Sequence, residues 1–375
     1  MVELPAKSKV RKRIVYLDYL RALAIITVIL FHVGKRMDFA IVMDYAAMPS
    51  VNWFINDFLI VCCRCGVDIF LMLSGALSLG RKWDIKSFLG KRIPRIVIPF
   101  IFWGAVLCIV IWVLDSYAGI NMVFSKYYMG VIHTNGIWSF LDFLSNSLTG
   151  HNKWFGPYWF FWMILGTYLI MPIFNKWIYH SDMKEVEYFL VIWLVTCIFS
   201  MSFLNFEFPI KLTYFTGPIG MVVLGYYLRH TDREIFKNIW FSILLIVIGG
   251  VSAMYFSYAN STPAEMYYMS RYSICLAVEV IGIFLLFKNI DSMKINALVG
   301  EGSILRKTSF SIAKYSYGIY LVHQFVMNIL MVLLIPFVNY KGLIVLLSIG
   351  TLVFSWGILA LLNRVPFMGN IIGSK

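Results

Sequence analysis

The sequence predicts an all-α fold: a polytopic membrane helix bundle with about ten transmembrane helices and both termini in the cytoplasm. The chain has 375 residues, of which 60% are hydrophobic and 14% charged. Apolar runs recur at about 20 residues, the length that a helix needs to cross the hydrocarbon core. Placing the N-terminus inside puts 23 of the 32 Lys and Arg residues in inner segments and seven in outer ones. Cytoplasmic loops carry such an excess of basic residues, so the orientation is well defined.

The apolar runs predict helices over residues 14–34, 54–79, 92–114, 157–175, 188–204, 210–228, 239–257, 270–287, 313–335 and 342–363. A basic cytoplasmic tail, residues 1–13, leads into the first of them. No small-residue cleavage site follows, so we expect the first helix to remain in the mature protein rather than be removed as a signal peptide. The membrane domain covers residues 14–363, followed by a short cytoplasmic tail at 364–375. The largest hydrophilic insertion, 115–156, is expected to form an extracytoplasmic loop.

The net charge of +13 follows from this topology. A nucleic-acid partner is not expected, because no contiguous soluble surface exists to carry a basic footprint. All six cysteines lie in apolar segments. The run Cys62-Cys63-Arg64-Cys65 lacks the two-residue spacing and the second ligand pair of zinc sites, so we interpret these residues as small helix residues and expect no metal.

Arg21 and His32 stand out within the first apolar run. Eleven residues bring two side chains back to within about 20° of each other on a helix, and place them about 16 Å apart along its axis. Ionisable residues inside a membrane usually face an internal path, and Asp18 lies close by in the same run. Histidine can take a proton from a hydroxyl near neutral pH. The alternative is a packed histidine bonded to a backbone carbonyl.

The third helix opens on the inner side with Lys91, Arg92 and Arg95. Guanidinium groups three residues apart lie on neighbouring faces of one turn, and their geometry suits phosphates. These residues could form a phosphate clamp at the inner mouth of the bundle. They could equally be ordinary anchors against anionic lipid.

The second helix contains Arg64 and Asp68, which are four residues apart and can pair on one face. Ser74-Gly75-Ala76 follows, and we interpret these small residues as a place of close helix packing. Both members of the Arg64–Asp68 pair are candidates for lining an internal cavity.

The late helices carry three further candidates for lining the cavity: Glu279, Tyr320 and His323. Glu279 is an isolated carboxylate deep in its helix, so it should face the cavity or a partner. For His323, a buried structural histidine is the main alternative to a cavity position.

Five motifs occur in an order that resembles the acyltransferase-3 family of integral membrane acyltransferases, in particular the branch that O-acetylates surface polysaccharides. They cover nearly the whole chain: Arg21 with His32, Gly66-Val67-Asp68-Ile69-Phe70 with Ser74-Gly75, Arg92 with Arg95, Trp159-Phe160 with Gly166 to Pro172, and Tyr320-Leu321-Val322-His323. One position departs from the family pattern, because Pro157 stands where many members carry a histidine. His151 or the run Lys153–Phe155 could substitute there.

The resemblance implies transfer of an acyl group, usually acetyl, from cytoplasmic acyl-CoA to a hydroxyl of a cell-surface glycan or lipid-linked sugar. The partners implied are the bilayer of the cell membrane, acyl-CoA and the glycan. Lys91, Arg92 and Arg95 would bind the phosphates of the donor. His32 would act as base on the acceptor hydroxyl or carry the acyl group itself, and Arg21 would position the donor or stabilise developing negative charge.

Two other functions fit some of the same features. A transporter of a glycan, lipid-linked sugar or acyl species could also use a buried Arg and His and a basic inner mouth, although the sequence shows no repeated half. A membrane sensor or structural protein is the third alternative. Incorporation of label from acetyl-CoA into a glycan would distinguish the enzyme from both.

Overall fold

The computed structural model describes residues 14–41, 50–118, 136–151, 153–199, 217–259, 273–292 and 302–374. All the regular elements in these ranges are helices, three of them short 3-10 helices (η1, η2 and η5). In chain order they are α1 (Val15–Ile41), α2 (Val51–Val61), η1 (Cys62–Cys65), α3 (Gly66–Ser78), α4 (Ile85–Ala118), α6 (Gly136–Leu148), η2 (Lys153–Tyr158), α7 (Trp159–His180), α8 (Met183–Phe199), α9 (Pro218–His230), η5 (Glu234–Lys237), α10 (Ile239–Ala259), α11 (Ile274–Ser292), α13 (Ile304–Leu334), α14 (Tyr340–Leu362) and α15 (Met368–Ile371).

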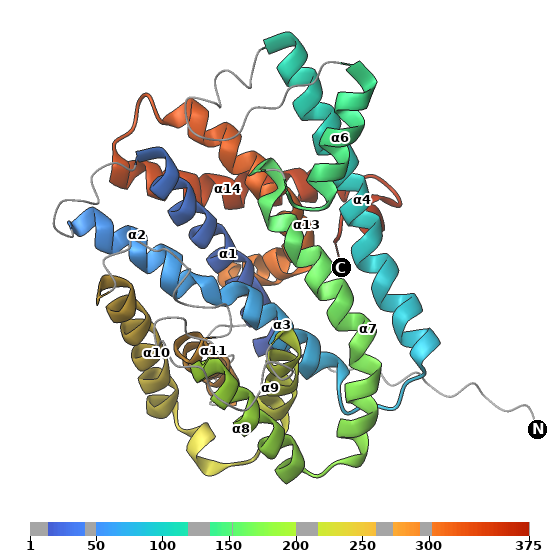
Figure 1. The fold of residues 1–375 in the computed structure, drawn as a ribbon, viewed down its shortest axis with the longest axis vertical. Helices are drawn as coiled ribbons and strands as arrows, with labels where there is room; N and C mark the ends of the chain where they lie inside the picture. Colours follow the sequence, from blue (N-terminus) through green and yellow to red (C-terminus); the bar gives the residue numbers. More distant parts are fainter. Residues whose placement is uncertain are drawn as a thin grey trace, which may run out of the picture.

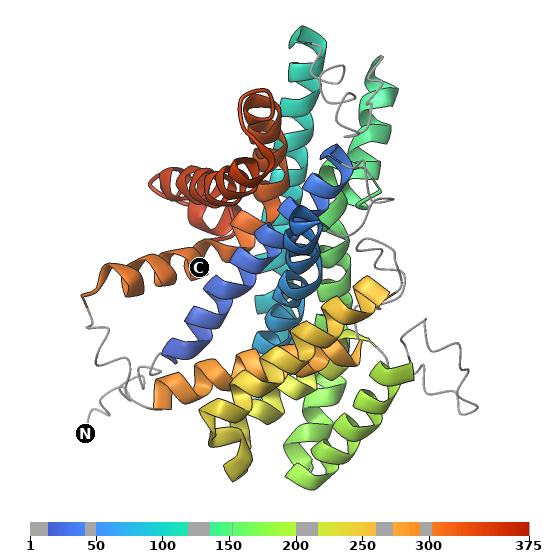
Figure 2. The ribbon, with the colours of Figure 1, turned by 90° about the vertical axis from the view of Figure 1, so that its left-hand side faces the viewer.

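Helix α1 lies at the centre of the bundle, where it contacts α2, α3, α11, α13 and α14. Helices α4 and α7 pack together along one flank, and α8 to α11 gather at one end (Figure 1). The view at 90° keeps α1 and α3 between the α13–α14 pair and the α10–α11 pair (Figure 2). The central position of α1 explains why polar side chains on it meet partners from several parts of the chain.

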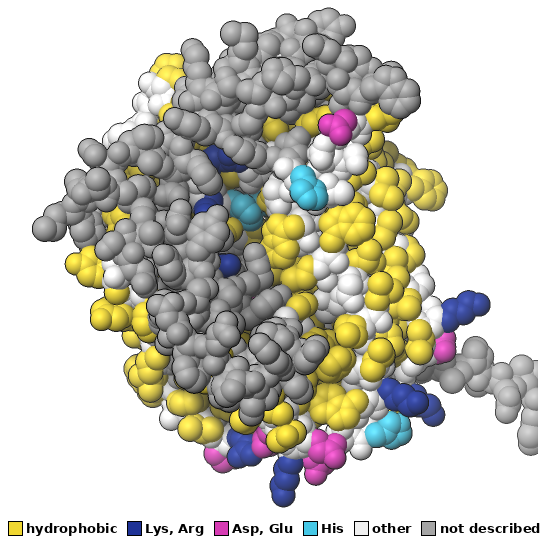
Figure 3. All heavy atoms as spheres, viewed as in Figure 1, with side chains coloured by type: hydrophobic (Ala, Val, Ile, Leu, Met, Phe, Trp, Pro, Cys, Tyr) yellow, Lys and Arg dark blue, Asp and Glu magenta, His cyan; other side chains and the backbone are white. Residues whose placement is uncertain are grey.

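The prediction of a polytopic helical bundle is confirmed. Within the described ranges, seven segments are long and apolar enough to cross a membrane: Val15–Met37, Val51–Ser78, Ile85–Leu114, Trp154–His180, Ile239–Ala259, Ile304–Leu334 and Tyr340–Leu362. The other three predicted helices correspond to α8, α9 and α11, with 17, 13 and 19 described residues. Side chains exposed on the outer helices are largely hydrophobic, as they are over α7 in Figure 3.

Two predicted elements have finer structure than the sequence predicts. The helix predicted at 54–79 is one span, Val51–Ser78, which includes the short 3-10 turn η1, and Gly66 after this turn lies close to Ala24 on α1. The segment 115–156 was expected to be a loop. Its described part contains α6, whose apolar face packs against α4.

Hydrogen bonds bring several of the basic inner segments to one end of the bundle. Asn175 at the end of α7 donates from Nδ2 to the carbonyl of Arg81 at 2.9 Å. Lys288 of α11 donates from Nζ to the carbonyl of Leu228 at 2.8 Å, at the end of α9. These contacts join segments that the distribution of Lys and Arg places on the same side of the membrane. Charged side chains gather at the end of the molecule where α7 leads into α8 (Figure 3).

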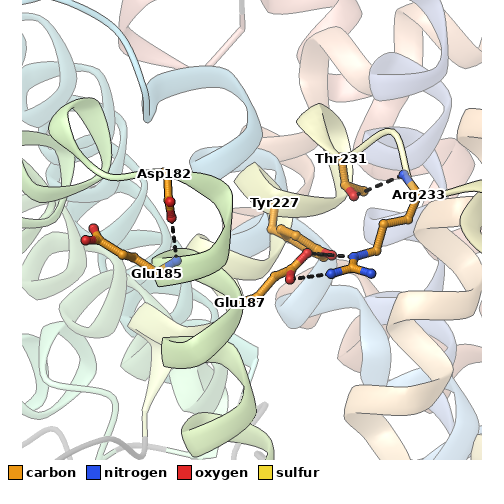
Figure 4. A network of polar contacts seen from close by, with 6 residues as sticks. All are labelled: Asp182, Glu185, Glu187, Tyr227, Thr231 and Arg233. Carbon is orange, nitrogen blue, oxygen red and sulfur yellow. Dashed lines mark hydrogen bonds and ion pairs between the residues drawn. The ribbon is translucent and has the colours of Figure 1, made fainter.

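A polar network joins α8 to the segment after α9 at this end (Figure 4). The Glu187 carboxylate accepts hydrogen bonds from Arg233 Nε at 2.7 Å and Nη2 at 2.5 Å, and from the Tyr227 hydroxyl at 2.6 Å. These bonds, first of all those from Arg233, lower the pKa of Glu187 from 4.5 to about 2. The carboxylate therefore stays charged at physiological pH.

Residues 368–374, expected to be part of a tail, pack against α4. The indole Nε1 of Trp103 donates to the carbonyl of Ile372 at 3.2 Å, and the Ile372 side chain is fully buried. Gly373 follows with φ of 81°, a conformation that glycine adopts readily. This segment thereby becomes part of the wall of the site described next.

Candidate active site

A cavity of about 290 Å³ lies between α1, α3, α4, α7 and α13 at the end where α3 leads into α4. Four of its lining side chains are cationic: Arg21, Arg92, Arg95 and Lys314. The remaining lining residues are Phe70, Leu73, Ser74, Leu77, Ile96, Phe160, Ile164, Tyr168, Ala313, Ser316, Tyr317, Tyr320 and Gly373. Since no carboxylate is among these described lining residues, the cavity is suited to a ligand with several negative charges.

The two arginines of α4 enter the cavity from one turn of that helix, as their spacing predicts. Arg92 donates from Nη2 to Ser78 Oγ at 2.7 Å, and its guanidinium lies 5.8 Å from the centre of the Phe88 ring. Ser78 ends α3, so this bond ties the guanidinium to a second helix. A positioned fork of donors is the arrangement that recognises a phosphate.

Arg21 reaches the same cavity from the central helix. Its Nη1 lies 3.3 Å from Asp18 Oδ1, one turn earlier, and the side chains are 31% and 13% exposed. Asp18 therefore orients the guanidinium while part of it faces the cavity. Of the two residues singled out in the first helix, Arg21 lines this cavity and His32 is not among its lining residues.

A second, more open recess of about 590 Å³ adjoins the cavity. Its lining residues are Gly90, Lys91, Pro94, Arg95, Ile98, Asn370, Gly373 and Ser374. Arg95 and Gly373 line both spaces, so the recess and the cavity lie side by side. Lys91 therefore lies in the outer recess and Arg92 in the inner cavity, with Arg95 between them.

At its deep end the cavity is bounded by aromatic rings. Tyr320 is 3% exposed, and its ring centre lies 5.1 Å from that of Phe160. The Tyr320 hydroxyl donates to the carbonyl oxygen of Pro157. The position that departs from the family pattern thus still contributes a polar contact, through its backbone instead of a histidine side chain.

His32 lies beyond Tyr320, next to His323. Nδ1 of His32 is 2.7 Å from the carbonyl oxygen of Val28, one turn earlier. Because a carbonyl oxygen only accepts hydrogen bonds, Nδ1 carries the proton and the lone pair of the neutral ring is on Nε2. His32 is half-buried, so its Nε2 is the nitrogen that suits proton transfer.

The other predicted cavity residues lie elsewhere. Asp68 and Glu279 are buried, with 0% and 5% exposure, and Arg64 lies in η1, which packs against α1, α2, α10 and α11. None of the three is among the lining residues of the cavity or the recess. The run Lys153–Phe155 lies in η2, where Trp154 and Phe155 are buried. His151 is exposed, with Nδ1 2.8 Å from Thr149 Oγ1.

The cavity is also lined by Lys314 and Tyr317, which sequence reasoning passed over, and by Ser74. Lys314, Tyr317 and Tyr320 are spaced by three residues on α13, a helical spacing that could have identified them as one face. The Tyr317 hydroxyl donates to the carbonyl of Ile96 at 2.8 Å and joins α13 to α4. Ser74, interpreted as a packing residue, donates to the carbonyl of Phe70 at 3.0 Å while facing the cavity.

A family model described as an acyltransferase domain matches residues 14–360, which cover α1 to most of α14. No curated protein and no solved structure matches the chain. The match includes Arg21, Arg92 and Arg95 at the cavity, and it includes His32 and His323. The chain therefore belongs to the acyltransferase-3 family of membrane acyltransferases.

Proposed function

We propose that this membrane acyltransferase moves an acetyl group from cytoplasmic acetyl-CoA to a hydroxyl of a cell-surface glycan or lipid-linked sugar, in the plasma membrane. The observation that supports it most strongly is the convergence of four cationic side chains from three helices, α1, α4 and α13, on one cavity. Ordinary lipid anchors point outward from the ends of helices. These four line one cavity instead, and Arg21 and Arg92 are half-buried, so topology alone does not explain them.

The donor is an elongated molecule with a phosphorylated adenosine at one end and a thioester at the other. We assign the phosphorylated end to the outer recess, where Lys91 and Arg95 supply positive charge. Arg92, held by Ser78, then meets the diphosphate at the entrance of the cavity. The arm that carries the acyl group follows the cavity toward Tyr320.

Arg21 positions the donor in this scheme. Eleven residues of helix place it about 16 Å from His32 along the axis, too far to contact atoms that react beside the histidine. Its place in the cavity wall, with Asp18 behind it, fits a contact to the phosphate or amide groups of the donor.

His32 is the catalytic base. Its Nε2 takes the proton of the acceptor hydroxyl, whose oxygen forms a bond to the thioester carbon. The carbon–sulfur bond then breaks, and the proton passes from Nε2 to the departing thiolate to give free CoA. The bond from Nδ1 to the Val28 carbonyl leaves the lone pair on Nε2, which supports this role.

The test uses membranes from cells that produce the chain, incubated with acetyl-CoA labelled in the acetyl group. We expect label in a glycan or lipid-linked sugar fraction, released by mild alkali as an O-ester would be. The acyltransferase proposal for acetyl-CoA is contradicted if the wild-type chain gives no more esterified label than membranes without it.

Transport is the second candidate, because an arginine within the span Val15–Met37 and a cavity lined by cationic side chains would also suit an exporter of an anionic lipid or sugar. Vesicle uptake of labelled donor or sugar without ester formation would support that function instead.

A further inference from the structure

Two histidines from helices far apart in the sequence meet in the interior of the bundle. Nε2 of His323 on α13 lies 3.4 Å from Nδ1 of His32 on α1, and the ring centres are 4.9 Å apart. The His323 side chain has 0% exposure. The hydrogen-bond partners of the two imidazoles determine which nitrogen of each ring carries the proton.

Two backbone carbonyls determine the positions of these protons. Nδ1 of His323 is 2.6 Å from the carbonyl oxygen of Tyr320, and Nδ1 of His32 is 2.7 Å from that of Val28. A carbonyl oxygen cannot donate, so both Nδ1 atoms carry protons. Of the two nitrogens that face each other between the rings, only Nδ1 of His32 therefore carries a proton. His323 Nε2 presents its lone pair to that proton.

We propose that His323 is the positioning residue for His32: together with the Val28 carbonyl it holds the tautomer with the lone pair on His32 Nε2, and it shares the Nδ1 proton when the ring becomes positively charged. This inference rests on the proposed role of His32 as base. In hydrolases with a nucleophile, a base and an orienting group, the orienting group is commonly a carboxylate behind the base. Here a neutral imidazole takes that place, which keeps a second charge out of the membrane interior.

His323 exchanges no proton in the reaction. The proton of the acceptor hydroxyl moves to His32 Nε2 and from there to the thiolate of CoA. Meanwhile the Nδ1 proton of His32 stays between the Val28 carbonyl and His323 Nε2. The contact of 3.4 Å is long for a hydrogen bond, and contacts at catalytic groups tighten when charge develops.

Two substitutions separate orientation from packing. His323→Phe keeps the ring and its volume but removes the acceptor that faces His32. His323→Gln supplies an amide oxygen that can accept from His32 Nδ1 and an amide nitrogen that can donate to the Tyr320 carbonyl. We expect His323→Phe to lower kcat about 10- to 100-fold with little change in KM for donor or acceptor. His323→Gln should retain a kcat well above that of His323→Phe.

The control is His180→Gln, which changes an exposed histidine at the end of α7 and should leave both constants unchanged. Equal losses in the Phe and Gln variants, or a loss carried by KM, would assign His323 to packing and overturn the proposal. Thermal unfolding in detergent shows whether each variant is folded.

A spectroscopic measurement tests the pair without any activity or variant. In protein labelled with ¹⁵N at histidine, the ring shifts of both residues should be those of the tautomer protonated at Nδ1. A proton on Nε2 of His323 contradicts the proposal, even if the variants fail to fold. If the wild-type chain transfers no acetyl group, the proposed function fails, while the ring shifts still decide the geometry of the pair.

Discussion

At the scale of single residues, the structure shows which basic side chains line the cavity, a distinction that the sequence alone does not make. Lys82 and Arg92 belong to the same basic inner segment, yet Lys82 is exposed and Arg92 lines the cavity. The spacing of Arg92 and Arg95 predicts their common face, and the intramembrane position of Arg21 predicts an internal role. Lys314 was not predicted as a site residue, because basic residues near inner helix ends are usually topology signals.

We expect Arg92→Gln and Arg95→Gln each to raise the KM for acetyl-CoA about 10- to 100-fold, since each removes charged hydrogen bonds to phosphate. The KM for the acceptor should change much less. Lys82→Gln removes the same charge at the same end outside the cavity, and serves as the matched control. Steady-state rates over a range of donor concentrations measure both constants. If the arginine variants behave as Lys82→Gln does, these residues are anchors and not a donor site.

The partnership of His32 and His323 could not be predicted, because 291 residues separate them and the sequence does not say which helices are neighbours. Each ring bonds to a backbone carbonyl, as the alternative of a packed histidine predicts. That bond is compatible with a catalytic role, since it sets the tautomer that a base needs.

At the scale of elements, apolar length predicts the spans but not the local helix type. The predicted helix 54–79 is one span, Val51–Ser78, in which the 3-10 turn η1 lies beside the close approach of Gly66 to α1. The small residues of Ser74-Gly75-Ala76 were expected to allow close helix approach. The structure shows that approach between α3 and α9.

Gly75 offers a direct test of this contact. A Cβ atom there would overlap the backbone carbonyl of Val222 on α9, and backbone cannot move aside as a flexible side chain can. We expect Gly75→Ala to destabilise the fold by about 1–3 kcal/mol, seen as a lower unfolding temperature in detergent. Gly357→Ala in α14 adds the same methyl group where no atom lies within 4 Å, and should be neutral or stabilising. Equal unfolding temperatures for the two variants would show that the close α3–α9 approach is wrong.

The Glu187–Arg233 ion pair between α8 and the segment after α9 should make the stability of the fold depend on pH in the acidic range. Its contribution is present in full above the ordinary Glu pKa of 4.5 and is lost as the pH falls through the lowered pKa of about 2. Glu187→Gln removes it at every pH. We therefore expect the difference in unfolding temperature between wild type and variant to shrink between about pH 5 and pH 2. A difference that stays constant over this range would contradict the ion pair.

At the scale of the whole molecule, the alternation of basic segments predicts which loops share a side, and the contacts of Arg81 with Asn175 and of Leu228 with Lys288 join such loops. The cavity lies at this basic end, and the histidine pair lies deeper in the bundle. In the proposed function, a soluble cytoplasmic donor would enter at this end and meet an acceptor from the other face. The sequence could not give the position of the cavity, because five helices from distant parts of the chain form its wall.

The proposed transfer of an acyl group from acetyl-CoA depends on His32. The most direct measurement compares alkali-labile label in the glycan and lipid-linked sugar fractions of membranes carrying either wild type or His32→Ala, with labelled acetyl-CoA supplied to the cytoplasmic face. We expect the wild type to incorporate label and His32→Ala to lose it by a factor of at least about 100, while both proteins unfold at similar temperatures in detergent. Transfer by His32→Ala at the wild-type rate would contradict the account.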